Sequence, residues 1–310
     1  MSDSLRPETA DQVAEAIRDA AGPLAIEGGG GLGGLGRPVQ AEATLRLDRL
    51  KGVVEYSPTE LYATFRAGAP LAEAKAALAE KGQRLPFDPP DLTGLYGSEG
   101  AATVGGVVAA ALSGPARVAV GAARDFLIGV RFVDGTGQAL HGGGKVMKNV
   151  TGYDLCKLTA GAFGTLGAIT EATFKVLPLA PAEATLAIRG LDDADGQAVL
   201  AAAFRSPFEP MGAAHLPESV AARIDGLPQG GAATLLRLEA FPESLAYRRQ
   251  AIRAHLPGDA DIVEIEGEAS AAIWRAIRDV APFAAPDARP LWRISTAPTA
   301  GPGVVARVAA

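Results

Sequence analysis

The sequence predicts an α+β protein in two parts, and three observations support this fold class. Residues 1–180 alternate short strands and helices with three glycine-rich segments. Residues 181–310 follow the order strand, helix, strand, strand, helix, strand of a ferredoxin-like layer. Between the two parts, Pro178 and Pro181 interrupt the pattern, as the boundary between two domains does. A length of 310 residues also favours two domains.

The first part is expected to contain three helices. Apolar residues recur at helical spacing over Thr9–Ala21, and Gly22-Pro23 ends that helix. A second helix, Pro70–Lys81, has proline at its start and Gly82 just past its end. A third, Thr103–Leu112, consists of small and apolar residues, so it is expected to be buried.

The strands of the first part are recognised by short apolar or alternating runs between turn residues. They are Leu24–Ile26, Val53–Ser57, Leu61–Ala67, Phe126–Val133, Gln138–His141 and Gly167–Leu177. Asp134-Gly135 is expected to join the fourth and fifth of these strands as a hairpin turn.

The second part is read in the same way, and no internal repeat is visible in it. Its expected strands are Glu183–Arg189, Ala213–Leu216, Thr234–Phe241, Asp261–Ile265 and Leu291–Ser295. Its expected helices are Ala194–Arg205, Glu243–Leu256 and Ala269–Val280.

Composition excludes several classes of protein. The chain is 48% hydrophobic and 21% charged, so it can bury a core. Its net charge of −6, without a cluster of Lys and Arg, argues against a nucleic-acid partner. The longest apolar run, Ala101–Leu112, is too short to span a bilayer, and the N-terminus has no signal-peptide core. The single cysteine, Cys156, excludes an internal disulfide and a cysteine-cluster metal site. We expect a cytoplasmic protein.

The first glycine-rich segment is Gly28–Gly31, directly after a strand. Because glycine has no side chain, the backbone N–H groups of such a loop can approach a phosphate and form an anion nest. The segment fits neither the G-x-G-x-x-G fingerprint of a Rossmann fold nor a Walker A loop. Taken alone, it is explained equally well as a flexible turn.

The second segment, residues 100–107, contains only small residues and opens a helix. A helix start of this kind can present free N–H groups and the positive end of the helix dipole to a pyrophosphate. Close packing of an Ala/Gly helix against a sheet is the alternative.

The third segment runs from Lys148 to Gly167 and reads KNVTGYDLCKLTAGAFGTLG. An exposed lysine is usually just solvated, but Lys148 stands beside Asn149 in a loop punctuated by glycines, which favours a ligand. Three glycine-rich segments spread from Gly28 to Gly167 fit a large, extended cofactor better than a nucleotide held by one motif.

With these segments in this order, ending in KNVTGYDLCKLTAGAFGTLGAITEATFKVLP, the chain resembles a known family. It looks like the PCMH-type FAD-binding domain shared by vanillyl-alcohol oxidase, D-lactate dehydrogenase and glycolate oxidase flavoproteins. Within this family it is most similar to the smaller flavin subunits of bacterial glycolate oxidases. The resemblance covers about residues 8–180 closely and 181–300 loosely. It implies an FAD-binding domain at 1–180 and a cap or substrate domain at 181–310.

The resemblance also implies which residues contact FAD. Those expected at the pyrophosphate, or along the pyrophosphate and flavin, are Gly28, Gly29, Gly30, Gly31, Ala102, Thr103, Val104, Gly105 and Gly106. Those expected further along the cofactor, near the flavin ring or near the adenine-ribose end are Ser113, Gly114, Asn149, Gly152, Tyr153 and Ile169. Tyr153 and Lys148 are the candidate catalytic residues.

The chain departs from the family pattern in three ways. Many relatives bind FAD covalently through a histidine beside the glycine loop, but residues 26–37 contain none, so we expect non-covalent FAD. Metal-assisted relatives carry paired histidines, whereas His141, His215 and His255 are not at i, i+4 spacing, so we expect no metal. Relatives usually end in a return segment onto the FAD domain, which the tail up to Ala310 is expected to lack.

The function that the resemblance implies is that of an FAD-binding subunit of a glycolate oxidase or dehydrogenase complex. It would oxidise a small 2-hydroxy acid, glycolate to glyoxylate, and pass electrons through flavin to partners. The expected partners are a catalytic flavoprotein subunit and an iron–sulfur subunit, which could hold the chain peripherally at the inner membrane. Two alternatives stay open, a non-catalytic structural subunit and an independent FAD-dependent hydroxy-acid or alcohol dehydrogenase.

A substrate carboxylate would be bound best by the planar fork of an arginine. Arg237, Arg275 and Arg293 are candidates on expected strands and helices. An ordinary surface position explains each of them more simply.

Overall fold

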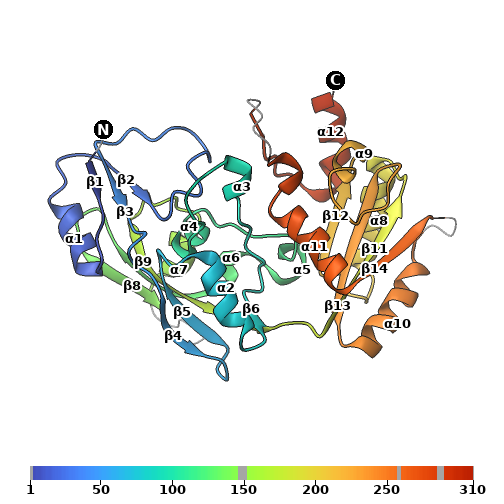
Figure 1. Ribbon diagram of the computed structural model, residues 1–310, viewed down its shortest axis with the longest axis horizontal. Coiled ribbons are helices and arrows are strands. Elements are labelled where there is room, and N and C mark those ends of the chain that lie inside the picture. Colours follow the sequence, from blue (N-terminus) through green and yellow to red (C-terminus); the bar gives the residue numbers. More distant parts are fainter. Residues whose placement is uncertain (1–2, 146–151, 257–259, 285–289, 310) are drawn as a thin grey trace. The chain divides into compact units, whose positions relative to one another are not determined.

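The computed structural model describes residues 3–145, 152–256, 260–284 and 290–309 (Figure 1). The chain forms two compact units. Unit 1 consists of Met1–Gly114 and Gly121–Leu179, and unit 2 of Pro115–Val120 and Ala180–Ala310. Helices and sheets are present in both, so the predicted α+β class is confirmed.

Unit 1 contains a small parallel sheet at its N-terminal end (Figure 1). Its strand order is β1 (Asp3–Leu5), β3 (Ala43–Arg46), β2 (Leu24–Glu27). Helix α1 (Ala10–Arg18) begins at Thr9, whose side chain accepts a hydrogen bond from the Gln12 N–H. Val13 of this helix packs with Leu45 and Val133 in one core cluster, which joins the small sheet to the larger one.

The larger sheet of unit 1 has five strands, and all its neighbours are antiparallel. Their order is β4 (Val53–Ser57), β5 (Tyr62–Arg66), β9 (Ala168–Lys175), β7 (Leu127–Val133), β8 (Ala139–Gly143). A short pair, β6 (Gln83–Arg84) and β10 (Leu177–Pro178), completes the strands described in this unit. Its described helices after α1 are α2 (Leu71–Ala79), α3 (Thr93–Tyr96), α4 (Val104–Ala109), α6 (Ala123–Phe126) and α7 (Leu155–Thr159).

Helix α4 lies against β5 and β9, and its side chains (VGGVVA) are small enough to allow close packing. Val104, Val107 and Val108 are buried, and a Cβ built on Gly105 would lie 2.8 Å from the Cβ of Ala67. The helix is shorter than the predicted Thr103–Leu112, since Ala111 adopts a positive φ of 47° and ends it.

Unit 2 is built on a four-stranded antiparallel sheet. Its order is β12 (Gly212–Leu216), β13 (Ala233–Ala240), β11 (Ala182–Arg189), β14 (Ile262–Glu266). Along the chain, α8 (Asp193–Arg205) follows β11, α9 (Glu218–Ala221) follows β12, α10 (Pro242–Arg253) follows β13 and α11 (Gly267–Arg278) follows β14. This order and pairing are those of a ferredoxin-like layer, as the sequence predicts.

Both faces of the unit 2 sheet are covered. Leu186 and Leu236 pack with Val199 of α8 and Ile252 of α10 on one face. Ala187 and Leu235 pack with Ile273 and Trp274 of α11 on the other. The short helix α5 (Arg117–Val120), which the chain contributes from the middle of its first part, contacts β12.

One predicted strand is wrong. Leu291–Ser295 has no regular structure, and Leu291, Trp292 and Ile294 are 53%, 80% and 56% exposed. Alternating apolar residues form a strand only where a neighbouring strand pairs with them, and none does here among the described residues. The tail beyond it is a 3₁₀ turn (Pro298–Ala300) and helix α12 (Gly301–Ala309), both of which contact α8. Among the helices of the described ranges, none is long and apolar enough to cross a membrane.

Candidate cofactor site

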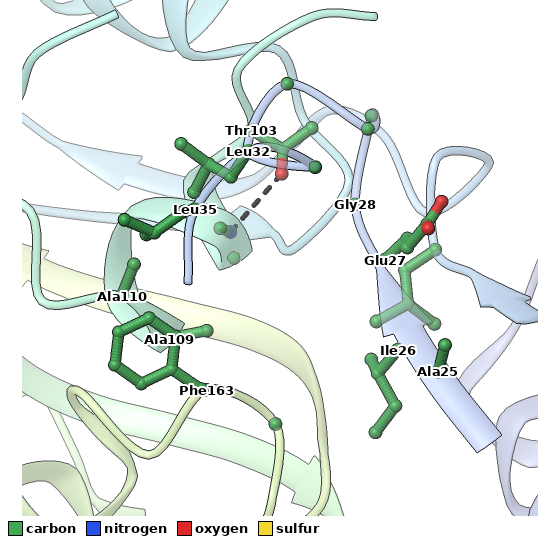
Figure 2. A pocket seen from close by; sticks show the side chains of 18 of the residues that line it. Ala25, Ile26, Glu27, Gly28, Leu32, Leu35, Thr103, Ala109, Ala110 and Phe163 are labelled. Carbon is green, nitrogen blue, oxygen red and sulfur yellow. Dashed lines mark hydrogen bonds between the residues drawn. The ribbon is translucent and has the colours of Figure 1, made fainter. Parts of the chain in front are cut away.

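A pocket of about 540 Å³ lies within unit 1, between the end of β2, the glycine loop, α4 and the segment that leads into β9 (Figure 2). The glycine loop is Gly28–Gly31. Nine of the fifteen predicted cofactor contacts line this pocket, namely Gly28, Gly29, Gly30, Gly31, Ala102, Thr103, Gly105, Gly106 and Ile169. The three glycine-rich segments recognised in the sequence therefore contribute to one pocket, the third through Phe163–Thr165 and Gly167.

The glycine loop packs closely against residues 100–103. A Cβ built on Gly28 would lie 2.2 Å from Thr103 Oγ1, and one on Gly29 would lie 2.2 Å from the Ala101 carbonyl oxygen. A Cβ on Gly100 would lie 1.7 Å from the Gly29 carbonyl oxygen. Any side chain at these positions would force the two segments apart, so close packing explains these glycines without a ligand.

The N–H groups at the start of α4 are already used. Val104 N–H donates to the Ala69 carbonyl at 3.0 Å, and Gly105 N–H to the Ala67 carbonyl at 2.7 Å. Gly106 N–H donates to Thr103 Oγ1 at 3.3 Å, the dashed line of Figure 2. The expectation that this helix start offers free donors to a pyrophosphate is therefore wrong, because nearby acceptors of the protein take them.

The glycine loop is different. Among the described residues, the backbone N–H groups of Gly29, Gly30 and Gly31 have no hydrogen-bond acceptor. Gly30 has a φ of +82°, the left-handed conformation whose alternation with right-handed residues turns successive N–H groups toward one point. These three N–H groups are therefore available to an anionic group at the pocket.

Apolar side chains form much of the remaining wall. Figure 2 shows Leu32 and Leu35 near Thr103, and the Phe163 ring beside Ala109 and Ala110. The Phe163 N–H donates to the Ala109 carbonyl at 2.9 Å, which fixes the loop of Phe163 onto α4. Such walls suit the flat, apolar rings of a cofactor and keep water from them.

The sequence did not single out these wall residues as contacts. Phe163 and Gly164 lie inside the recognised motif, but the contacts predicted from that motif are Asn149, Gly152, Tyr153 and Ile169. A Cβ on Gly164, whose φ is +75°, would lie 3.4 Å from the Cβ of Ile26. The signal that could have found this contact is the glycine itself, since it marks a close approach to another segment.

Five of the predicted contacts do not line the described pocket. Val104 is buried and does not line the pocket. Ser113 accepts a hydrogen bond from the Ala123 N–H at 2.9 Å, and the Gly114 N–H donates to the Phe87 carbonyl. Gly152 and Tyr153 do not line the pocket either, and Tyr153 is 90% exposed.

The two remaining predicted residues, Lys148 and Asn149, lie outside the described residues. The only ionisable side chains described in the pocket lining belong to Glu27 and Arg37. A general base is therefore not identified by the described part of the wall.

The surroundings of His215 indicate a structural rather than a catalytic role. His215 lies 3.1 Å from Asp193 Oδ1 through Nε2 and 2.8 Å from Thr234 Oγ1 through Nδ1. Thr234 is fully buried, so this Asp-His-Thr chain has no accessible nucleophile and ties α8 to β12 and β13.

Burial raises the pKa of the Cys156 thiol to about 11, which suits a packing residue. In the described ranges, no group of three or more His, Cys, Asp or Glu is placed to hold a metal ion.

Arg237 is not the ordinary surface arginine that the sequence favoured. Its side chain is 6% exposed, lies 3.5 Å from Glu239 Oε1 and is stacked 5.1 Å from the centroid of Trp274. The buried strand β13 carries it on the face covered by α11, a placement that only the tertiary fold determines.

Comparison with known proteins points to FAD, the cofactor predicted from the sequence. Residues 4–143 match a family model described as an FAD binding domain. The chain is 48% identical over 168 residues to the glycolate oxidase subunit GlcE of Escherichia coli (strain K12), covering 54% of this chain and 46% of that protein. It is 33% identical to an uncharacterized FAD-linked oxidoreductase of Mycobacterium tuberculosis (strain H37Rv), covering 56% and 37%. The chain thus spans less than half the length of these curated relatives.

Solved structures support the fold. Alkyldihydroxyacetonephosphate synthase has a TM-score of 0.68 at 17% identity, covering 90% of this chain and 55% of the other. p-Cresol methylhydroxylase has a TM-score of 0.67 at 16% identity, covering 84% and 57%. The match to an FAD binding domain confirms the predicted FAD cofactor. Residues 4–143 of the chain are thus similar to an FAD binding domain, and the chain shares its fold with these two proteins.

Proposed function

We propose that this chain is the FAD-binding subunit of a glycolate oxidase or dehydrogenase complex, which oxidises glycolate or a similar 2-hydroxy acid. The observation that carries the proposal is the 48% identity over 168 residues with a glycolate oxidase subunit. Further support comes from the D-2-hydroxyglutarate dehydrogenase of Stutzerimonas stutzeri (strain A1501), which is 28% identical over 207 residues. In this proposal residues 1–180 are the FAD domain and 181–310 a cap or substrate domain.

In such an oxidation, FAD supplies the acceptor for the hydride that leaves the α-carbon. The residues of this chain would bind and shield it. The N–H groups of Gly29, Gly30 and Gly31 would hold the diphosphate, and the wall at Phe163 and Ile26 would exclude water from the rings. No histidine occurs in residues 26–37, so the cofactor is held without a covalent bond to this loop.

The substrate chemistry is assigned mainly to a partner. The described pocket lining offers Glu27 and Arg37 as its ionisable side chains and contains no histidine. Lys148 and Tyr153 stay the candidates for a catalytic role on this chain, with Asn149 and Gly152 beside the flavin. A catalytic flavoprotein subunit then carries the principal substrate site.

Electrons leave through another subunit in this scheme. A chain whose single cysteine is the buried Cys156 has no ligand set for an iron–sulfur cluster. We therefore propose an iron–sulfur partner, and attachment to the inner membrane only through such partners.

The experiment is anaerobic reduction by glycolate, followed by the visible absorbance of the flavin. The isolated chain and the chain co-purified with its partner subunits are compared. Bleaching in the complex, together with slow or no bleaching of the isolated chain, supports the proposed role. Fast reduction of the isolated chain would instead identify an independent dehydrogenase. A flavin on this chain that stays oxidised in every preparation would indicate the structural subunit, which the shortage of ionisable groups in the pocket also favours.

A further inference from the structure

Arg46 is placed directly behind the glycine loop. Strands β2 and β3 pair in parallel, and their register sets Arg46 beside Glu27, the last residue before the loop. The guanidinium reaches past this neighbour, because a Cβ built on Gly30 would lie 3.2 Å from Arg46 Nη2. Arg46 does not line the pocket itself, whereas Glu27 and Gly30 do.

The guanidinium of Arg46 is only partly satisfied by the protein. Its Nε is buried, and among the described residues no acceptor lies within hydrogen-bonding distance of it. The nearest carboxylate oxygen is Glu27 Oε2, at 3.8 Å from Nε, which is an ion pair but not a hydrogen bond. A buried donor left without an acceptor costs free energy, so its retention next to the loop calls for a reason.

The negative charge of Glu27 explains why Arg46 is placed there. Glu27 contributes a negative charge to the wall of a pocket whose loop donors are free to bind an anion. An unopposed carboxylate there would repel a diphosphate. Arg46 offsets this charge, and its Nη2 lies close to the position that a side chain at Gly30 would occupy.

We propose that Arg46 is a positioning residue for the diphosphate of FAD. It acts through the glycine loop and through Glu27 rather than by touching the cofactor. The inference rests on the proposed pocket as the FAD site.

The test is fluorescence titration of the full chain with FAD at low salt. Arg46→Gln should raise the dissociation constant about tenfold, and Arg46→Lys should restore most of the affinity because it keeps the charge. Glu27→Gln should change the affinity in the opposite direction and tighten binding. The matched control is Arg49→Gln, since Arg49 forms an exposed ion pair with Glu8 and should leave the constant unchanged.

Salt separates an electrostatic role from a purely structural one. The difference between wild type and Arg46→Gln should shrink as salt approaches about 1 M, where charges are screened beyond about 3 Å. Equal affinity of Arg46→Gln and wild type, or equal loss in Arg46→Lys and Arg46→Gln, would overturn the inference. If Arg46→Gln does not fold, the FAD affinity of Glu27→Gln tests the proposal instead. Weaker FAD binding by Glu27→Gln than by wild type would contradict it. Failure of the wild-type chain to bind FAD at all would instead contradict the proposed function.

Discussion

Gly100→Ala tests the crossing of the two glycine-rich segments. A Cβ at this position would lie 1.7 Å from the Gly29 carbonyl oxygen, and both partners are backbone. Because real Cβ atoms essentially never approach below 3.0 Å, the segments must separate by more than an ångström. Overpacking of this kind costs about 1–3 kcal/mol. Displacing the loop also moves the N–H groups of Gly29–Gly31, so FAD affinity should fall at least about tenfold.

Gly135→Ala is the matched control. Nothing lies within 4 Å of a Cβ at this position, its φ is not positive, and it does not line the pocket. Urea denaturation of the FAD-free chain gives the stability difference, and fluorescence titration gives the affinity. Gly100→Ala with unchanged stability and unchanged FAD affinity would refute the crossing of these segments as described.

Three further predictions concern other parts of the molecule. Cys156 should react slowly with a disulfide reagent at pH 8 until the chain unfolds, because burial raises its pKa to about 11; rapid reaction of the native protein would contradict this. His215→Ala should lower the free energy of unfolding by about 1–3 kcal/mol, since it leaves Thr234 without that partner, while FAD affinity stays unchanged; a fall in affinity would oppose a structural role. Lys145 lies beside Glu55 and lowers the pKa of the Glu55 carboxyl in the folded protein. The ion pair therefore stabilises the fold above the pKa that Glu55 has in the unfolded chain, and this stabilisation is lost as pH falls through the lowered pKa of the folded state. Glu55→Gln should therefore flatten the acid limb of a plot of stability against pH, and an unchanged limb would count against the pair.

The glycine-rich segments that the sequence singled out line one pocket, and the signal at several of their glycines is local. Gly29 and Gly105 mark close approaches to the backbone of Ala101 and Ala67, and Gly28 marks a close approach to the Thr103 side chain. The order of strands and helices in unit 2 was likewise readable, because each element carries its own apolar period.

The sequence could not predict which distant residues would contact a given donor, strand or side chain. The donors at the start of α4 are taken by Ala67 and Ala69, residues of another segment, so a helix start that looked free is not. Leu291–Ser295 has the pattern of a strand but no described neighbour with which to pair. The burial of Arg237 depends on Trp274, from a helix distant in sequence.

The measurement that tests the central claim most directly is a visible absorbance spectrum of the purified full chain, before and after acid precipitation. We predict a flavin spectrum, with the yellow colour released to the supernatant, as expected for FAD held by the glycine loop without a covalent bond. Colour that stays in the pellet would contradict non-covalent binding. A colourless chain that added FAD does not restore would contradict the assignment of this pocket as a working FAD site.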